Sequence, residues 1–111
     1  MTTLLERIDL ERRTERERLR LETRDALRVA LRELLPGIPV IVFGSLTQPG
    51  RFTHASDVDL ALETEPPDCS IYQLSSLLGE RLGRSVEVML LPECRFRDKI
   101  LVQGERWIPL A

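Results

Sequence analysis

Residues 2–35 contain neither glycine nor proline, and most of them are strong helix formers such as leucine, arginine, glutamate and alanine. Pro36 and Gly37 follow this stretch directly, and both residue types are common where a helix ends. We therefore predict one long helix over Thr2–Leu35. The chain has 111 residues, which is the size of one small domain, so we expect residues 1–111 to form a single domain that includes this helix.

The two halves of the predicted helix differ in polarity. The N-terminal half, Asp9 to Arg20, has few apolar positions, so we expect it to project into solvent or onto a partner protein. The C-terminal half carries apolar residues at helical spacing, and we expect these to pack on a sheet: Ala26, Leu27, Ala30, Leu31 and Leu34.

Arginine recurs at every fourth position of the predicted helix and forms a basic ridge. One interpretation is a solvated surface, in which each arginine pairs with an acid three or four residues away, for example Arg12 with Glu15. The other is a ridge that docks on an acidic surface of a partner. Both interpretations remain open for the six arginines, which are Arg12, Arg16, Arg20, Arg24, Arg28 and Arg32.

The rest of the chain alternates segments typical of strands and helices. Ser70 can cap a helix that stops at Gly83, and a last short helix is expected over Glu93–Gln103. This order predicts an α+β fold, with a small sheet of about three to four strands and helices packed on one face. The extended segments are a β-branched run at Ile38–Phe43, an alternating run at Asp57–Glu63, a third strand at Ser85–Leu91 and a short tail at Arg106–Leu110.

The composition excludes several classes of protein. With 42% hydrophobic and 31% charged residues, and no apolar run near the roughly 20 residues of a spanning helix, the chain is not expected in a membrane. Residues 1–20 lack the apolar core of a signal peptide, so we expect a cytoplasmic protein, with Cys69 and Cys94 as reduced thiols. A net charge of −2 argues against direct nucleic-acid binding.

Acidic residues are the first candidates for a functional site. Asp57 and Asp59 are two positions apart on a predicted strand, so their carboxylates project from the same side and can bridge a hard cation such as Mg²⁺. The alternative is a strand with a solvated acidic face. Glu87 lies on the polar face of another predicted strand and would complete the site if the two strands are neighbours.

Gly44 and Ser45 form a second candidate, directly after a predicted buried strand. A turn of this kind offers backbone amides and a hydroxyl group that can bind phosphate oxygens. An ordinary strand-ending turn is the alternative interpretation.

Taken together, these residues resemble a known signature. The run from Gly44-Ser45 through a glycine-containing loop to Ser56-Asp57-Val58-Asp59-Leu60 resembles that of the minimal nucleotidyltransferases, the MNT branch of the DNA polymerase β superfamily. The segment 83–88 looks like the strand that carries the family's third carboxylate, and 96–107 looks like its closing helix. The resemblance covers roughly residues 24–108.

The resemblance implies a nucleotidyltransferase fold and an enzyme that transfers a nucleotide from ATP with the help of two Mg²⁺ ions. In this reading Asp57, Asp59 and Glu87 are the catalytic residues and hold the metal ions, and Glu87 also helps to deprotonate the attacking hydroxyl group. Gly44 and Ser45 would bind the β- and γ-phosphates of ATP.

Short members of this family commonly act as antitoxins of HEPN-domain ribonuclease toxins, by transferring AMP to a tyrosine hydroxyl of the toxin. The resemblance therefore implies a protein adenylyltransferase antitoxin whose partner is a HEPN toxin, with the long helix as a possible docking element. Two alternatives stay open: an antitoxin with little or no catalytic activity that neutralises its toxin by binding, and a small-molecule nucleotidyltransferase.

The sequence departs from the family pattern at a few positions. The third carboxylate is Glu87 where aspartate is usual, and residues 46–48 lack the arginine that often follows Gly-Ser. Arg51 either replaces that arginine or is a solvated loop residue. In the last helix, the basic residues either contact the triphosphate or form surface charge: Arg95, Arg97 and Lys99.

Overall fold

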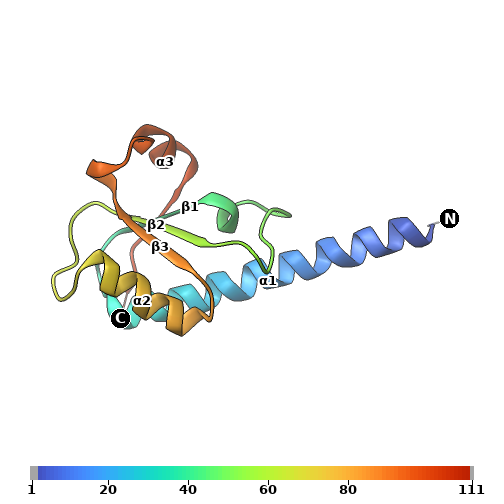
Figure 1. Cartoon of the computed structure of the whole chain (residues 1–111), viewed down its shortest axis with the longest axis horizontal. Helices are drawn as coiled ribbons and strands as arrows, with labels where there is room; N and C mark the ends of the chain where they lie inside the picture. Colours follow the sequence, from blue (N-terminus) through green and yellow to red (C-terminus); the bar gives the residue numbers. More distant parts are fainter. Residues whose placement is uncertain (1–2, 111) are drawn as a thin grey trace.

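The N-terminal helix is present as α1, which spans Leu4–Leu34 in the computed structural model; the structure describes residues 3–110. Thr3 caps it, because the Thr3 hydroxyl accepts a hydrogen bond from the Glu6 amide at 3.1 Å and the Glu6 carboxylate accepts one from the Thr3 amide at 3.2 Å. The predicted helix is thus confirmed, although its expected first residue, Thr2, lies outside the described residues. Figure 1 shows that the N-terminal part of α1 extends away from the rest of the chain.

A four-stranded mixed sheet forms the centre of the fold, in the order β3-β2-β1-β4. β2 pairs in parallel with β3, whereas β1 pairs antiparallel with both β2 and β4. The predicted α+β class is therefore confirmed, and part of the expected extended tail forms a fourth strand. The strands are β1 (Val40–Phe43), β2 (Val58–Leu62), β3 (Val86–Leu90) and β4 (Glu105–Trp107).

Helices α1 and α2 cover one face of this sheet. α2 spans Ile71–Leu82; Ser70 caps its start, and Gly83 ends it in the left-handed conformation with φ at 67°. The main core lies between these helices and the sheet. Of the apolar stripe predicted on α1, only Ala26 is exposed. The core includes Leu27, Leu31, Val40, Val42, Leu60, Leu74 and Leu78.

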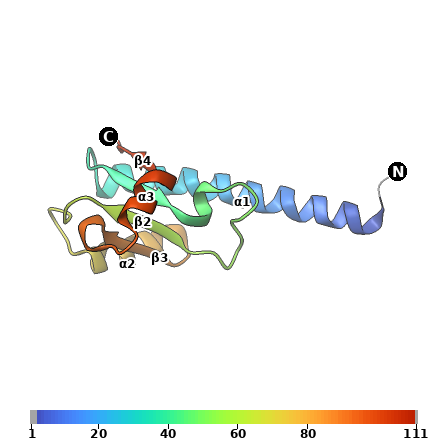
Figure 2. The ribbon, with the colours of Figure 1, turned by 90° about the horizontal axis from the view of Figure 1, so that it is seen from above.

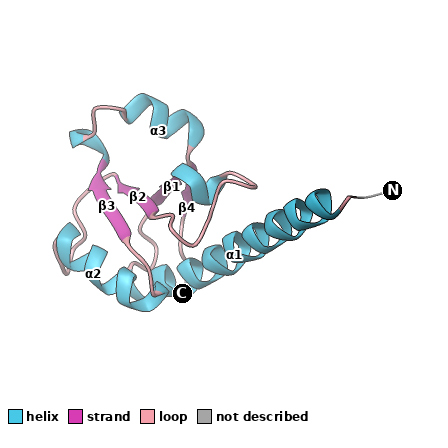
Figure 3. Cartoon of the chain, turned by 45° about the vertical axis from the view of Figure 1, so that its right-hand side comes forward, coloured by secondary structure: helices cyan, strands magenta, loops and turns pink. Residues whose placement is uncertain are grey.

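The third helix, α3 (Arg97–Gln103), lies on the opposite face of the sheet, as Figure 3 shows; in Figure 2, which is seen from above, α3 overlies the strands. The expectation that the helices pack on one face holds for α1 and α2 and is wrong for α3. The reason is a second, smaller apolar cluster in which Ile100 of α3 covers Ile41 and Ala61 on the sheet. The helix also starts later than predicted, because Leu91–Glu93 form a short 3₁₀ turn (η2) before it.

The arginine ridge of α1 divides into two parts. Its inner part packs against the chain itself: the buried Arg20 donates to the carboxylate of Glu17 at 2.6 Å, and Arg24 donates to Glu105 at 2.7 Å. The guanidinium groups of Arg24 and Arg28 also lie over the ring of Trp107. Arg24 and Arg28 therefore attach α1 to β4, although the side chain of Arg28 stays 42% exposed.

The outer part of the ridge is solvated. The expected ion pair between Arg12 and Glu15 is not formed among the described residues, because Glu15 pairs with Arg18 at 2.7 Å instead. None of the helices within residues 3–110 has both the length and the apolar character required to cross a membrane.

Candidate active site

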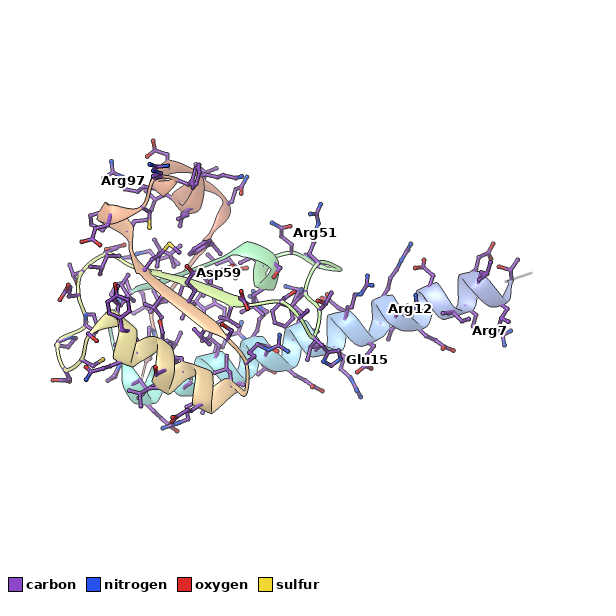
Figure 4. All side chains as sticks on the ribbon, viewed as in Figure 1. Arg7, Arg12, Glu15, Arg51, Asp59 and Arg97 are labelled. Carbon is purple, nitrogen blue, oxygen red and sulfur yellow. The ribbon has the colours of Figure 1, made fainter. Side chains whose placement is uncertain are left out.

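Two of the predicted carboxylates, Asp59 and Glu87, are brought side by side by the sheet. β2 and β3 are parallel neighbours, and their register places Asp59 directly opposite Glu87. Val58, Leu60 and Leu62 of β2 enter the main core, so the alternation of a strand turns Asp59 to the face on which α3 lies. The condition that the two strands be neighbours is thus met (Figure 4 labels Asp59).

Asp59 is half-buried, and its pKa is raised to about 6. Desolvation by burial is the largest cause, followed by the negative charges of Glu87 and Asp57. Within residues 3–110, no hydrogen bond or ion pair engages the side chain of any of these three acids. The cluster therefore carries negative charge that the described side chains leave uncompensated, and a cation would be stabilised there.

Gly44 lies directly against Asp59. It follows β1 and opens a short 3₁₀ helix, η1 (Gly44–Thr47), with φ at 76°. A Cβ atom added to Gly44 would lie 2.5 Å from the Oδ2 atom of Asp59, a distance that only glycine permits. The sequence predicted a turn here, and the structure shows that this turn places the backbone of Gly44 next to Asp59.

Residues of α1 hold this turn in place. The carbonyl oxygen of Leu46 accepts hydrogen bonds from Arg20 at 3.1 Å and from Arg24 at 3.4 Å. Leu46 itself is fully buried. The sequence analysis gave these arginines no such role, and no local signal could, because the contact joins residues more than 20 positions apart.

Arg84 holds the loop that leads into β2 and was also missed. Its Nη1 atom donates to the carbonyl oxygens of Thr53 at 3.2 Å and Ser56 at 2.8 Å. Its guanidinium group stacks 4.5 Å from the ring centroid of the buried Phe52. Because Ser56 immediately precedes Asp57, Arg84 positions the backbone from which Asp57 projects. In the sequence, the only indication of a role for Arg84 was its position between Gly83, which ends α2, and the start of β3.

A pocket of about 790 Å³ lies between the sheet and α3. Gly44 and Glu87 line it, together with two of the three basic residues singled out near the last helix, Arg95 and Lys99. Arg97 is exposed (Figure 4). The pocket therefore combines cationic and acidic groups with an apolar wall made by Phe43, Met89, Phe96 and Ile100.

The oxygen atoms at this site suit magnesium, but the three acids do not converge on one metal position in the described part of the chain. Mg²⁺ prefers oxygen ligands and is often held by one or two carboxylates plus phosphate oxygens, which matches the adjacent Asp59 and Glu87. Within the described residues, however, no set of three or more His, Cys, Asp or Glu side chains forms a group that could hold a metal ion. Metal binding by Asp57, Asp59 and Glu87 stays a prediction. Cys69 and Cys94 are free thiols, as expected.

Comparison with known proteins gives a likeness in fold. No protein-family model matches the sequence, and none of the curated proteins matches it. A solved structure, the crystal structure of a toxin-antitoxin with AMP-PNP, is similar with a TM-score of 0.58 and 22% sequence identity. The similarity covers 75% of this chain and 71% of the matched chain. At this level of identity it shows a shared small α+β fold.

Proposed function

We propose that this protein is an antitoxin that acts as a Mg²⁺-dependent adenylyltransferase, transferring AMP from ATP to a hydroxyl group of its toxin. The observation that carries the proposal is the contact between Gly44 and Asp59, with Glu87 opposite Asp59 on the next strand. Gly44 and Glu87 in turn line one pocket together with Arg95 and Lys99. Nucleotidyl transfer needs this combination of a phosphate-binding turn, acidic metal ligands and nearby cations.

In this proposal the chain positions the triphosphate between its own groups. The amides of Gly44 and Ser45, at the start of η1, donate hydrogen bonds to the β- and γ-phosphates. Arg95 and Lys99 approach from the α3 side and balance the remaining charge. Asp57, Asp59 and Glu87 would hold Mg²⁺, which when bound neutralises negative charge around the α-phosphate and aligns the reacting oxygens.

Glu87 has a second role in the proposal, that of accepting the proton of the acceptor hydroxyl group. It is exposed and belongs to β3, the edge strand of the sheet, so an acceptor from another protein can approach it. The acceptor oxygen forms a bond to the α-phosphorus, the bond to the bridging oxygen breaks, and pyrophosphate leaves.

Two lines support a protein acceptor in the form of a toxin. The structural neighbour is a toxin-antitoxin with AMP-PNP, an analogue of ATP. The signature at residues 44–60 resembles that of MNT antitoxins, whose partners are HEPN ribonucleases modified on tyrosine. We propose the same class of partner and acceptor here.

The experiment is an assay with ATP labelled at the α-phosphate, Mg²⁺ and a candidate HEPN ribonuclease as the acceptor. We expect label on the toxin, lost with Asp59→Asn and with Glu87→Gln, and retained with Glu80→Gln, a control on the exposed surface of α2. One alternative function is an antitoxin that acts only by binding. It is favoured by the observation that, among the described residues, the three acids do not form a group that could hold a metal ion. Neutralisation of the toxin without any transfer of label would establish that alternative and overturn the proposal.

A further inference from the structure

The N-terminal part of α1 is a helix without a covering surface. Every residue from Leu4 to Arg16 is exposed, and we call this segment the arm. At 1.5 Å per residue the arm is about 20 Å long, enough to support a helix of another protein. Figures 1 and 4 show it leaving the domain, with Arg12 and Glu15 near its base and Arg7 further out.

The face of α1 that packs on the domain continues onto the arm. Spacings of three or four residues connect Leu27 and Thr23, which are buried, through Leu19 to positions on the arm. The same face then carries Arg16 and Arg12 at the base and Ile8 and Leu5 beyond them. Leu5 is 79% exposed and Ile8 36% exposed, so the apolar side of the helix continues where the domain no longer covers it.

At the base of the arm this face forms one wall of a shallow pocket of about 360 Å³. Its arm residues are Arg12, Glu15 and Arg16, and the opposite wall is the loop Thr53–Ala55. That loop ends two residues before Asp57, and Arg84 holds it in place. A partner seated in this pocket would therefore contact the loop that leads directly into Asp57.

The charges of the pocket are unbalanced in favour of cations. Glu15 is engaged by Arg18 at 2.7 Å. In the part of the chain that the structure describes, neither Arg12 nor Arg16 has an ion pair, although their neighbour Arg13 pairs with Asp9 at 2.7 Å. Two guanidinium groups without an ion pair therefore line the pocket, and they favour acidic groups in a protein that binds there.

We propose that the inner face of the arm and the 53–55 loop form the docking surface for the toxin, and that the toxin contributes acidic side chains to Arg12 and Arg16 and apolar side chains to Leu5 and Ile8. The inference rests on the proposed function for the identity of the partner. A nucleic acid fits less well, because exposed acids alternate with the arginines along the arm and would repel phosphates: Glu6, Asp9, Glu11 and Glu15.

The test measures the affinity of the purified protein, residues 1–111, for a candidate HEPN ribonuclease, by calorimetry at low and moderate salt. The double variant Arg12→Glu with Arg16→Glu is expected to raise Kd by about tenfold or more and to make Kd less dependent on salt. The double variant Leu5→Asp with Ile8→Asp is expected to raise Kd by a similar factor. The matched control is Arg7→Glu with Arg13→Glu, which changes the charge of the arm equally on its other sides and should stay within about threefold of the original Kd.

Circular dichroism and ATP affinity of each variant establish that helix and nucleotide site are intact. The docking surface is overturned if both double variants and the control bind equally well, or if the original protein binds no toxin. It is also overturned if the arm variants dissolve a homodimer or abolish RNA binding while toxin binding persists. Complex formation that depends on Arg12 and Arg16, but without transfer of AMP, would refute the adenylyltransferase and leave the docking surface standing.

Discussion

Gly44 and Asp59 are in contact, and the space between them admits no side chain. Gly44 directly follows β1, and Asp59 lies on the neighbouring strand β2, where the register places it opposite Phe43. Gly44 then turns away with φ at 76°, which brings its Cα atom to the carboxylate. The turn proposed to bind phosphate and the acid proposed to bind metal are therefore parts of one structure.

Gly44→Ala is predicted to abolish nucleotide binding. The new Cβ atom would meet Oδ2 of Asp59 at 2.5 Å, so the turn and the carboxylate must separate. The matched control is Gly50→Ala, because Gly50 also has a positive φ, at 81°, but a Cβ atom there meets nothing within 4 Å. Both variants should lose about 1–2 kcal/mol of stability from backbone strain, whereas only the Gly44 variant should lose ATP affinity in a calorimetric titration. Equal ATP affinity of the two variants would contradict the prediction.

The raised pKa of Asp59 predicts how stability varies with pH. In the folded protein its pKa is about 6, above the ordinary value of 3.8, so the folded state holds a proton that the unfolded state releases. Protonated Asp59 therefore contributes to the stability of the folded state at low pH, and this contribution is lost as pH rises from about 4 to about 6. Asp59→Asn, which cannot ionise, should be more stable than the original protein at pH 7 and similar to it near pH 4. Urea unfolding across this range checks the difference, with Asp68→Asn as a control outside the site.

The local parts of this fold follow from the sequence, and the long-range parts do not. Ser70 and Gly83 mark both ends of α2, because caps act within a few residues. The alternation in residues 57–63 likewise predicted that Val58 and Leu60 enter the core, as they do in β2. By contrast, the side on which α3 packs depends on which residues of the sheet need covering, and here a close approach of Gly104 to Ile41 allows it.

The same distinction applies to the candidate site. Gly44, Asp59 and Glu87 were predicted as candidates because each lies on a recognisable strand or directly after one. The residues that hold them act across the fold: Arg84 reaches a loop 28 and 31 positions away, and Arg20 reaches Leu46 from 26 positions away. Pairing of this kind is a property of the tertiary structure and leaves no periodic signal.

Arg84→Met is predicted to loosen the loop before Asp57. The change removes two hydrogen bonds to backbone carbonyls and the stacking on Phe52, so we expect a loss of about 1–3 kcal/mol in stability. Hydrogen exchange should accelerate at the amides of residues 53–57 more than in α2. Arg81→Met is the control, because Arg81 forms a surface ion pair with Glu33, and such pairs contribute about 0–1 kcal/mol. Unchanged exchange in the loop would show that Arg84 does not position it.

Arg24 and Glu105 join α1 to β4, and their pairing predicts acid sensitivity. The hydrogen bond from Arg24 is the largest cause that lowers the pKa of Glu105, with a smaller contribution from Trp107. A lowered pKa in the folded state means that this pair stabilises the protein above the ordinary pKa of 4.5, and that the stabilisation is lost as pH falls below it. Glu105→Gln should therefore lower stability at pH 7 and make little difference near pH 3. Thermal unfolding at the two pH values checks this, with Glu63→Gln as the control, since Glu63 pairs with Arg106 at the surface. An equal loss at both pH values would mean that packing around Trp107, and not the charge of Glu105, holds β4 to α1.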